Sequence, residues 1–548
     1  MDESLPPPPL PGTGPAGDII EKLSSVNVTQ SKPGSKQVKY RPFFSSVMIK
    51  RDVSDDLNVA NGGIVKKKYG DVSVNARVEA RMGSYTRGCG MGSDKSIFPL
   101  DSDDAAMSIL RELSDEAIWG CIDDFEDRYN QSIGMNYNRD IYRYFSKEAP
   151  VKYRQPTRNR QKVDLKEIED MLTEVTAKMK EKNVNGSRVF NSIATFGLSD
   201  QDRYLKNSEG TDIYTNYRRF NMFLSGSMRD ESALKKNNSL VWNQYTIAGI
   251  DMSKIPKADD LLEIGERLVG ELYDIAHAPQ ITTNIYPAIM CPKNHGVLWH
   301  EMAGHSMEGH RIQENEDGEN NANLFKGRIG EKITPEFLSL CDDPTREDLD
   351  GFYRFDDEGI PAQRVNLVEN GKLKDFLHCR ESAGYFRRRS NGHGRAEGAN
   401  DPVARMSNLI VKSDNEVSYG ELKENLVREI VNQKKRYGII LEGTMGGQVD
   451  TEEAVFNTFP VNLYKVDRKG REKRVKGIYI VGTPNQILES IIQTSDDYGY
   501  FNGSCGAESG RVPSTETAPH ALLRSLEVNM IPSDCYIRAP LPILNGYR

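Results

Sequence analysis

The chain has 548 residues, with 80 acidic and 72 basic side chains that give a formal net charge of -8. This length suggests two or three domains, each large enough to bury a core. No run of about 18 apolar residues is present, so we expect no membrane span, and the mild acidity gives no electrostatic reason to expect a nucleic acid partner.

The seven cysteines are scattered along the chain, odd in number and without a CxxC pair. This usage is typical of reduced thiols in a cytosolic protein. The first residues are acidic and proline-rich, and they lack the basic and apolar regions of a signal peptide. We therefore expect a cytoplasmic location.

Residues 1–40 differ in composition from the rest of the chain. They are rich in Pro, Gly, Ser and Lys and show no apolar period. Such a segment cannot bury enough apolar surface to offset the entropy of folding. We therefore predict a flexible arm.

Residues 41–279 combine helical and strand patterns. Asp164 and Glu167 form a capping box, and the apolar residues that follow, up to position 179, share one helical face. Residues 261–275 repeat this helical spacing, whereas the segments VFNSIATFG and VWNQYTIAGI predict strands. We expect a mixed α/β N-terminal domain.

Residues 280–548 are richer in glycine and in short β-branched runs. Asn370 and Gly371 stand between two alternating segments, which predicts a hairpin because both turn positions need positive φ. A capping box at Ser418 and Glu421 predicts one helix, and strands are expected at GIILEG, FPVNLYKV and KGIYIVG. We predict a mainly antiparallel β C-terminal domain, a barrel or a sandwich, so that the whole chain is α+β.

Half of the eight histidines fall within sixteen residues: His295, His300, His305 and His310. His300, Glu301 and His305 form an H-E-x-x-x-H motif, whose histidines are five positions apart. On a regular α-helix that separation is about 140°, so the two imidazoles could not reach one metal ion. A one-residue π-bulge would bring them onto one face, and we therefore predict that the motif lies on a distorted helix.

The motif contains the parts of a hydrolytic metal site. Two imidazoles would supply two ligands, while Glu301 would lie beside a water molecule that Zn²⁺ acidifies to a pKa near about 7. Glu301 could then take the proton of this water as it attacks a peptide carbonyl, acting as a general base.

A catalytic zinc site usually has a third protein ligand and an open position. The residue types that can fill this role stand both near the motif and far from it: Glu308, His310, His393 and Cys505. An iron site is a second possibility, although a set of one cysteine and two histidines favours zinc.

Other candidates carry weaker signals. Glu308 could orient a ligand histidine through a hydrogen bond. His393 and Arg395 stand in a loop with glycines and could bind a peptide terminus or carboxylate, or simply support the turn. Tyr498 and Tyr500 could polarise a scissile carbonyl, but packing is the simpler interpretation.

The segment HEMAGHSMEG resembles the HExxxH signature of the TldD/PmbA family of metalloproteases, in its metal-bearing TldD-like branch. Further segments are similar to the same family: NGHGR, RMSN, GGQVD, IYIVGTPNQIL and GSCGAESGRVP. The resemblance covers roughly residues 281–530, and the N-terminal half shares only a general character with the family.

The resemblance implies that the metal is held by His300, His305 and Cys505, with Cys505 standing in the family's GxCG segment. It also implies that Glu301 is the catalytic base. One departure concerns the residues after the GxCG segment, where the family often has Lys-x-Gly-Gln and this chain has Ala-Glu-Ser-Gly-Arg at 507–511.

For function, the resemblance implies a zinc-dependent peptidase acting on unfolded or extended peptides. It further implies a dimer, either of two copies or with a metal-free member of the family, whose β domains enclose a cavity. The alternative is a non-catalytic subunit that binds peptides or acts as a scaffold, as in family members that lack the His and Glu residues.

Overall fold

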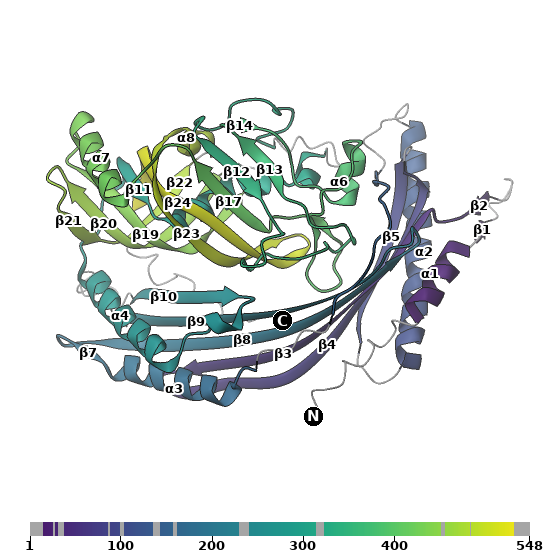
Figure 1. Cartoon of the computed structure of the whole chain (residues 1–548), viewed down its shortest axis with the longest axis horizontal. Helices are drawn as coiled ribbons and strands as arrows, with labels where there is room; N and C mark the ends of the chain where they lie inside the picture. The colour runs from purple at the N-terminus through teal and green to yellow at the C-terminus, as the bar shows by residue number, and fades with distance from the viewer. Residues whose placement is uncertain are drawn as a thin grey trace.

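The computed structural model describes residues 15–25, 28–30, 38–85, 88–98, 103–134, 143–156, 162–229, 240–313, 323–450, 455–482 and 484–530. Two sheets dominate the α+β fold, and helices lie on their outer surfaces (Figure 1). The first sheet is long and curved, and the second lies on its concave side (Figure 1).

The N-terminal sheet has eight strands, and its main path runs in the order β10-β9-β8-β3-β4-β5. Every pair along this path is antiparallel. The strands are β3 (Phe44–Ala60), β4 (Gly63–Ser84), β5 (Gly88–Phe98), β8 (Ser187–Asn207), β9 (Asp212–Arg229) and β10 (Leu240–Gly249), with short β6 (Lys152–Arg154) and β7 (Asn183–Val184) attached. The predicted strands VFNSIATFG and VWNQYTIAGI are confirmed as parts of β8 and β10.

Two predicted helices of this half are confirmed, α3 (Leu165–Glu181) and α4 (Ala258–His277). Asp164 caps α3, because its side chain accepts hydrogen bonds from the backbone N–H groups of Lys166 and Glu167. The apolar faces of both helices pack against β8 and β9 in one core. A third helix, α2 (Asp103–Gly134), packs on β4 and β5 and has no counterpart among the predictions.

The prediction of a flexible arm over residues 1–40 is wrong for residues 15–25, which form helix α1 (Pro15–Ser25). Ile19 and Leu23 are buried in a core shared with α2 and the sheet. Ala16, Ile19, Ile20 and Leu23 follow the helical spacing i, i+3, i+4 and i+7, a period of only two turns that the composition of the whole arm obscured. Strands β1 (Val28–Gln30) and β2 (Val38–Tyr40) pair with each other, and residues 1–14 lie outside the described residues.

The C-terminal sheet has twelve strands in the order β11-β19-β20-β22-β24-β17-β12-β13-β14, with β18, β21 and β23 attached. The strands are β11 (Asn284–Met290), β12 (Leu338–Asp342), β13 (Val365–Glu369), β14 (Lys372–Leu373), β17 (Asn408–Ser413), β18 (Glu416–Val417), β19 (Tyr437–Asp450), β20 (Val455–Asp467), β21 (Glu472–Val475), β22 (Ile478–Gly482), β23 (Ile491–Ala507) and β24 (Gly510–Met530). Most pairs are antiparallel, as predicted, but β11–β19, β17–β24 and β18–β23 are parallel. All twelve strands belong to one hydrogen-bonded sheet, in which β11 also pairs with β24.

Local predictions for this half hold. Asn370 and Gly371 have φ values of 48° and 75° in the turn between β13 and β14. Ser418 caps helix α7 (Tyr419–Asn432) by accepting a hydrogen bond from the backbone N–H of Glu421. The remaining elements are α5 (Pro292–Trp299), α6 (Arg380–Tyr385), α8 (Pro484–Glu489), the short η2 (Met252–Lys254), and β15 (Gly394–Arg395) paired with β16 (Val403–Ala404).

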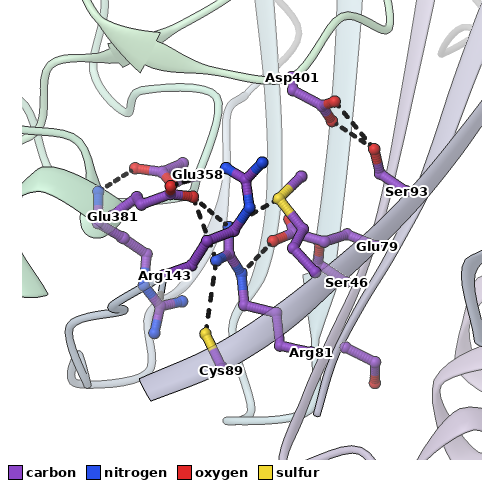
Figure 2. Close-up of polar contacts among 12 residues, drawn as sticks. Ser46, Glu79, Arg81, Cys89, Ser93, Arg143, Glu358, Glu381 and Asp401 are labelled. Carbon is purple, nitrogen blue, oxygen red and sulfur yellow. Dashed lines mark hydrogen bonds and ion pairs between the residues drawn. The ribbon is translucent and has the colours of Figure 1, made fainter. Parts of the chain in front are cut away.

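Ion pairs connect the N-terminal sheet to the C-terminal half of the chain. Arg81 on β4 donates to Glu79 at 2.6 Å and to Glu381 of α6 at 3.3 Å (Figure 2). A second contact joins Lys50 of β3 to Asp357, at 2.8 Å between Nζ and Oδ1. Because these side chains belong to different halves of the chain, their charges fix how the halves pack.

Within the described ranges, no helix is both long and apolar enough to cross a bilayer. The six cysteines in these ranges are free thiols and all are buried. Cys535 lies outside the described residues.

Candidate metal centre

The H-E-x-x-x-H motif follows α5, which begins at Pro292 directly after the buried strand β11. His300–Gly304 form a single π-helical turn, and the backbone N–H of His305 donates to the carbonyl oxygen of His300. This bond spans five residues and widens the turn by one residue. The predicted distortion is confirmed, and it brings the rings of His300 and His305 to a centroid distance of 4.9 Å.

Gly304 lies at the end of this turn, in close contact with a buried methionine. A Cβ atom at Gly304 would lie 2.0 Å from Sδ of Met406, which is completely buried. Glycine therefore allows the turn to approach the connection between β16 and β17 that carries Met406.

We expect Gly304→Ala to lower the free energy of unfolding by about 1–3 kcal/mol, because the added methyl group overpacks this contact. Gly270→Ala in α4 is the matched control, since no atom lies within 4 Å of its Cβ position; it should gain about 0.5–1 kcal/mol from the higher helix propensity of alanine. Thermal unfolding of both variants measures the effect. Equal stability of Gly304→Ala and wild type would contradict the packing argument.

Three side chains from distant parts of the chain converge next to the π turn. The ligand atoms of His300, His305 and Cys505 all lie within 4.8 Å of one another, and the three residues are buried. Sγ of Cys505 lies 3.7 Å from Nε2 of His305. Cys505 reaches this place from β23, which pairs with β24 in a long hairpin.

Each histidine of this group is oriented by a carboxylate on its other ring nitrogen. Nδ1 of His300 lies 2.6 Å from Oε1 of Glu516, and Nδ1 of His305 lies 3.2 Å from Oε2 of Glu308. A histidine that donates from Nδ1 presents Nε2 as a ligand atom, and such carboxylate partners are usual at metal sites. Gly296 of α5 makes room for Glu516, because a Cβ at this glycine would lie 2.9 Å from the Cβ of Glu516.

The electrostatics of the group favour a thiolate at Cys505. Burial alone would raise the pKa of Cys505, but the adjacent His300 and His305 hold this pKa well below 9.0. For His305, burial acts to lower the pKa, but Glu308 and Cys505 raise it to about 9. One thiolate and two imidazoles are a normal donor set for zinc, so the residues present fit the metal that the resemblance implies.

Glu301 lies beside these three residues. Its Oε2 is 3.9 Å from Nε2 of His305, and the residue is 8% exposed. Burial raises the pKa of Glu301 above 4.5, which makes its carboxylate a stronger base than a solvated one.

The other histidines of the cluster have separate roles. His295 is completely buried, with Nδ1 2.8 Å from the carbonyl of Pro519, while its Nε2 accepts a hydrogen bond from Trp299. His310 lies 2.5 Å from Glu508, in the segment where the chain departs from the family pattern. Neither residue belongs to the group of three ligand atoms.

The remaining sequence candidates lie outside this group. His393 is completely buried, and its Nε2 lies 3.1 Å from Oδ1 of Asp342. Arg395 donates to the carbonyl oxygens of Met406 and Pro513. Both side chains are occupied within the fold, which favours support of the loop over binding of a peptide terminus.

Tyr498 and Tyr500 are 39% and 46% exposed on β23. Between Tyr498 and Cys505, the pairing of β23 with β24 continues without a β-bulge. Because side chains alternate between the two faces of a strand, both tyrosines point to the face opposite Cys505. This placement argues against contact with a carbonyl at the centre, and also against the packing interpretation.

Sequence reasoning missed two residues of this region, Glu516 and Arg405. Glu516 is 216 positions from the histidine that it orients. Arg405 stands in the RMSN segment, where only the resemblance drew attention to it. Neither residue has a local spacing signal, because each depends on how distant strands pair.

Comparison with known proteins agrees with the fold. Residues 283–530 match the PmbA/TldA metallopeptidase C-terminal domain profile. A metalloprotease of Methanocaldococcus jannaschii is 28% identical over 351 residues, which are 64% of this chain and 71% of that protein. A zinc metalloprotease TldD homolog of Saccharolobus solfataricus is 26% identical over 294 residues, 50% of this chain and 62% of the relative.

Solved structures show the same fold over nearly the whole chain. TldE of Thermococcus kodakarensis superposes with a TM-score of 0.61 at 17% identity, covering 89% of this chain and 97% of that one. A Thermotoga maritima protein described as a modulator of a DNA gyrase gives a TM-score of 0.64 at 18% identity, covering 88% and 96%. The matched domain over residues 283–530, the related sequences and the shared fold therefore all support an assignment to the TldD/PmbA family.

Proposed function

We propose that the protein is a zinc-dependent peptidase that cleaves unfolded or extended peptides. His300, His305 and Cys505 hold the zinc ion, and Glu301 is the general base. The observation that carries this proposal is the convergence of the three buried ligand atoms within 4.8 Å of one another, with Glu301 next to them.

A bound zinc ion would supply a Lewis acid that polarises the scissile carbonyl and makes water more acidic. Glu301 accepts the proton of the attacking water at its carboxylate and can then pass it to the leaving amine. Glu516 and Glu308 keep the two imidazoles in the tautomer that presents Nε2. Burial of all these groups excludes bulk water and strengthens their electrostatic interactions.

The proposed substrate is a peptide without stable structure. An extended chain can add main-chain hydrogen bonds to a sheet edge whatever its sequence, so that pockets supply only modest selectivity. The proposed assembly is a homodimer or a heterodimer with a metal-free member of the family, and a cytoplasmic location stays a prediction. The fold shared with TldE is compatible with either assembly.

The competing proposal is a non-catalytic subunit that binds peptides or acts as a scaffold. The presence of His300, Glu301, His305 and Cys505 argues against it, because a subunit without chemistry has no need of a buried thiolate between two imidazoles. Metal content and cleavage activity distinguish the two functions.

We expect the purified protein to contain one zinc ion per chain, and a chelator to abolish peptide cleavage until zinc is restored. Cys505→Ser should weaken zinc binding at least about 100-fold, since loss of a hydrogen-bonding partner of a ligand alone costs about 10–100-fold. Cys341→Ser is the control, because Cys341 is equally buried but lies on β12 outside the group. Metal analysis and a peptide cleavage assay measure both effects.

Absence of zinc from the wild type, together with peptide binding without cleavage, would support the scaffold function instead. Full zinc occupancy in Cys505→Ser would move the third ligand to Glu308, His310 or His393.

A further inference from the structure

Glu308 connects the π turn to two arginines. It is completely buried, and its Oε2 contacts both Nδ1 of His305 at 3.2 Å and Nε of Arg311 at 2.8 Å. Its Oε1 has no hydrogen bond and faces Nε of Arg405 at 3.6 Å. The carboxylate of Glu308 therefore orients the candidate ligand His305 and also forms ion pairs with two guanidinium groups.

The other donors of Arg405 go to residues 505–510, the end of β23 with the tight turn that leads to β24, here called the Cys505 turn. Nη2 donates to the carbonyl oxygen of Cys505 itself at 2.6 Å. Nη1 donates to Oγ of Ser509 at 2.8 Å and to the carbonyl oxygen of Gly510 at 2.9 Å. Arg405 is completely buried, so none of these donors exchanges its partner for water. The guanidinium group of Arg405 thus contacts both the carboxylate of Glu308, which orients His305, and the backbone of Cys505.

The contacts of Arg405 matter for the distance between His305 and Cys505 in the metal centre. His305 and Cys505 are 200 positions apart, yet Nε2 and Sγ must stay about as close as the observed 3.7 Å for both to bind one ion. The rigid fork of a guanidinium group fixes several acceptors relative to one another, which a flexible ammonium group cannot do. A second link runs from Arg311, whose Nη2 donates to Glu508 in the same turn at 2.8 Å.

A purely electrostatic role does not explain Arg405. Arg311 already pairs with Glu308 at hydrogen-bond distance, whereas Arg405 stands farther away at 3.6 Å. The shortest contacts of Arg405 are those to the Cys505 turn. Arg405 is therefore placed to hold this turn in position through its hydrogen bonds.

We propose that Arg405 is a positioning residue of the metal centre, which holds the Cys505 turn against Glu308 and so sets the distance between the thiolate and His305. The inference rests on the proposed zinc binding by His300, His305 and Cys505. It concerns the affinity and the coordination of the ion, and it assigns Arg405 no contact with substrate.

The test compares Arg405→Lys with wild type, using Co²⁺ as a spectroscopic probe and Zn²⁺ as its competitor. We expect the variant to bind Co²⁺ about 10–100-fold more weakly, and its bound Co²⁺ to show a reduced thiolate-to-metal absorption band. Arg380→Lys is the matched control, because Arg380 is also completely buried but donates to the carbonyl of Ser146 and to Glu209, which do not belong to the group of three ligand atoms. It should leave both measurements unchanged.

A second comparison separates positioning from general support of the fold. In a Cys505→Ser background, Arg405→Lys should cost less than about twofold further in Co²⁺ affinity, because the group that it positions has gone. Should Arg405→Lys fail to fold, Ser509→Ala is the second variant. It removes one hydrogen-bond acceptor of Arg405 and should weaken Co²⁺ binding about two- to tenfold.

Wild-type affinity and an unchanged absorption band in Arg405→Lys, or in Ser509→Ala where that variant replaces it, would overturn the inference while leaving the zinc site in place. An equally large loss in the Cys505→Ser background would also overturn it. Failure of the wild type to bind either ion would instead overturn the proposed function.

Discussion

Glu301→Gln is expected to bind zinc as the wild type does but to cleave peptides about 100- to 10,000-fold more slowly. Loss of a positioned general base costs this much in rate. Glutamine keeps the size of the side chain and its place beside His305, so that the three ligands remain undisturbed. Metal analysis and peptide cleavage, measured on the same preparation, test both halves of the expectation.

Glu336→Gln is the control for this experiment, because Glu336 is 72% exposed and pairs with Lys332 at 3.1 Å on the surface. Its activity should equal that of the wild type. If Glu301→Gln cleaves as fast as the wild type, Glu301 is not the base. If it also loses zinc, the carboxylate is needed for the metal site rather than for proton transfer alone.

Asp357→Asn is expected to lower the free energy of unfolding by about 3–5 kcal/mol. Asp357 pairs with Lys50 and with Arg203, both from the N-terminal sheet, and the side chains of Lys50 and Asp357 are 2% and 6% exposed. Removal of the shared carboxylate leaves two buried cations without their nearest counter-charge, which costs far more than the intact pair contributes. Urea-induced unfolding followed by circular dichroism measures the loss.

The dependence on pH has a defined direction. Burial alone would raise the pKa of Asp357, but Arg203 and Lys50 hold it well below 3.8. A lowered pKa in the folded state stabilises the fold above about pH 4, and this contribution declines as the pH falls further. The difference between wild type and Asp357→Asn should therefore be full at pH 7 and shrink in acid.

Asp348→Asn is the matched control for the buried pair. Asp348 contacts Arg346 at 2.6 Å, but the two side chains are 58% and 47% exposed. Such a surface pair contributes at most about 1 kcal/mol. A loss of similar size in both variants would mean that Asp357 acts through something other than its buried charge.

The sequence predicted features that a few neighbouring residues determine. The five-residue spacing of His300 and His305 is incompatible with a shared ligand on a regular helix, and the π turn is the local solution found in the structure. The caps at Asp164 and Ser418 and the turn at Asn370 were predictable for the same reason, because each depends on side chains within three or four positions.

The rest of the site depends on distant pairing and could not be read from spacing. Cys505 was one of four candidate third ligands, and only the resemblance to a family singled it out, because a single cysteine so far from the motif carries no signal of its own. Glu516 lies opposite Phe501 in the β23–β24 hairpin, and only the register of that hairpin and the approach of α5 at Gly296 place it beside His300. No rule of sequence spacing relates these segments.

The fold, like the site, combines features that neighbouring residues predict with features that depend on distant contacts. Long apolar stripes predicted α3 and α4, but α1 is stabilised by contacts with α2 and the sheet that its own sequence does not reveal. The order of the strands was equally inaccessible, since β24 pairs with β11, β17, β22 and β23, which are scattered over the C-terminal half. The choice between a barrel and a sandwich could not be made from the sequence, because pairing order is a property of the whole sheet.

The 200-residue separation of His305 and Cys505 also matters for the unfolded chain. An ion held by both residues would act as a reversible cross-link across this loop, and closing a loop of that length costs on the order of 5 kcal/mol of conformational entropy. Much of that cost would be removed from the folding reaction whenever the ion stays bound. Metal supply would then govern how long the C-terminal sheet resists unfolding and proteolysis, in addition to whether the protein cleaves its own substrates.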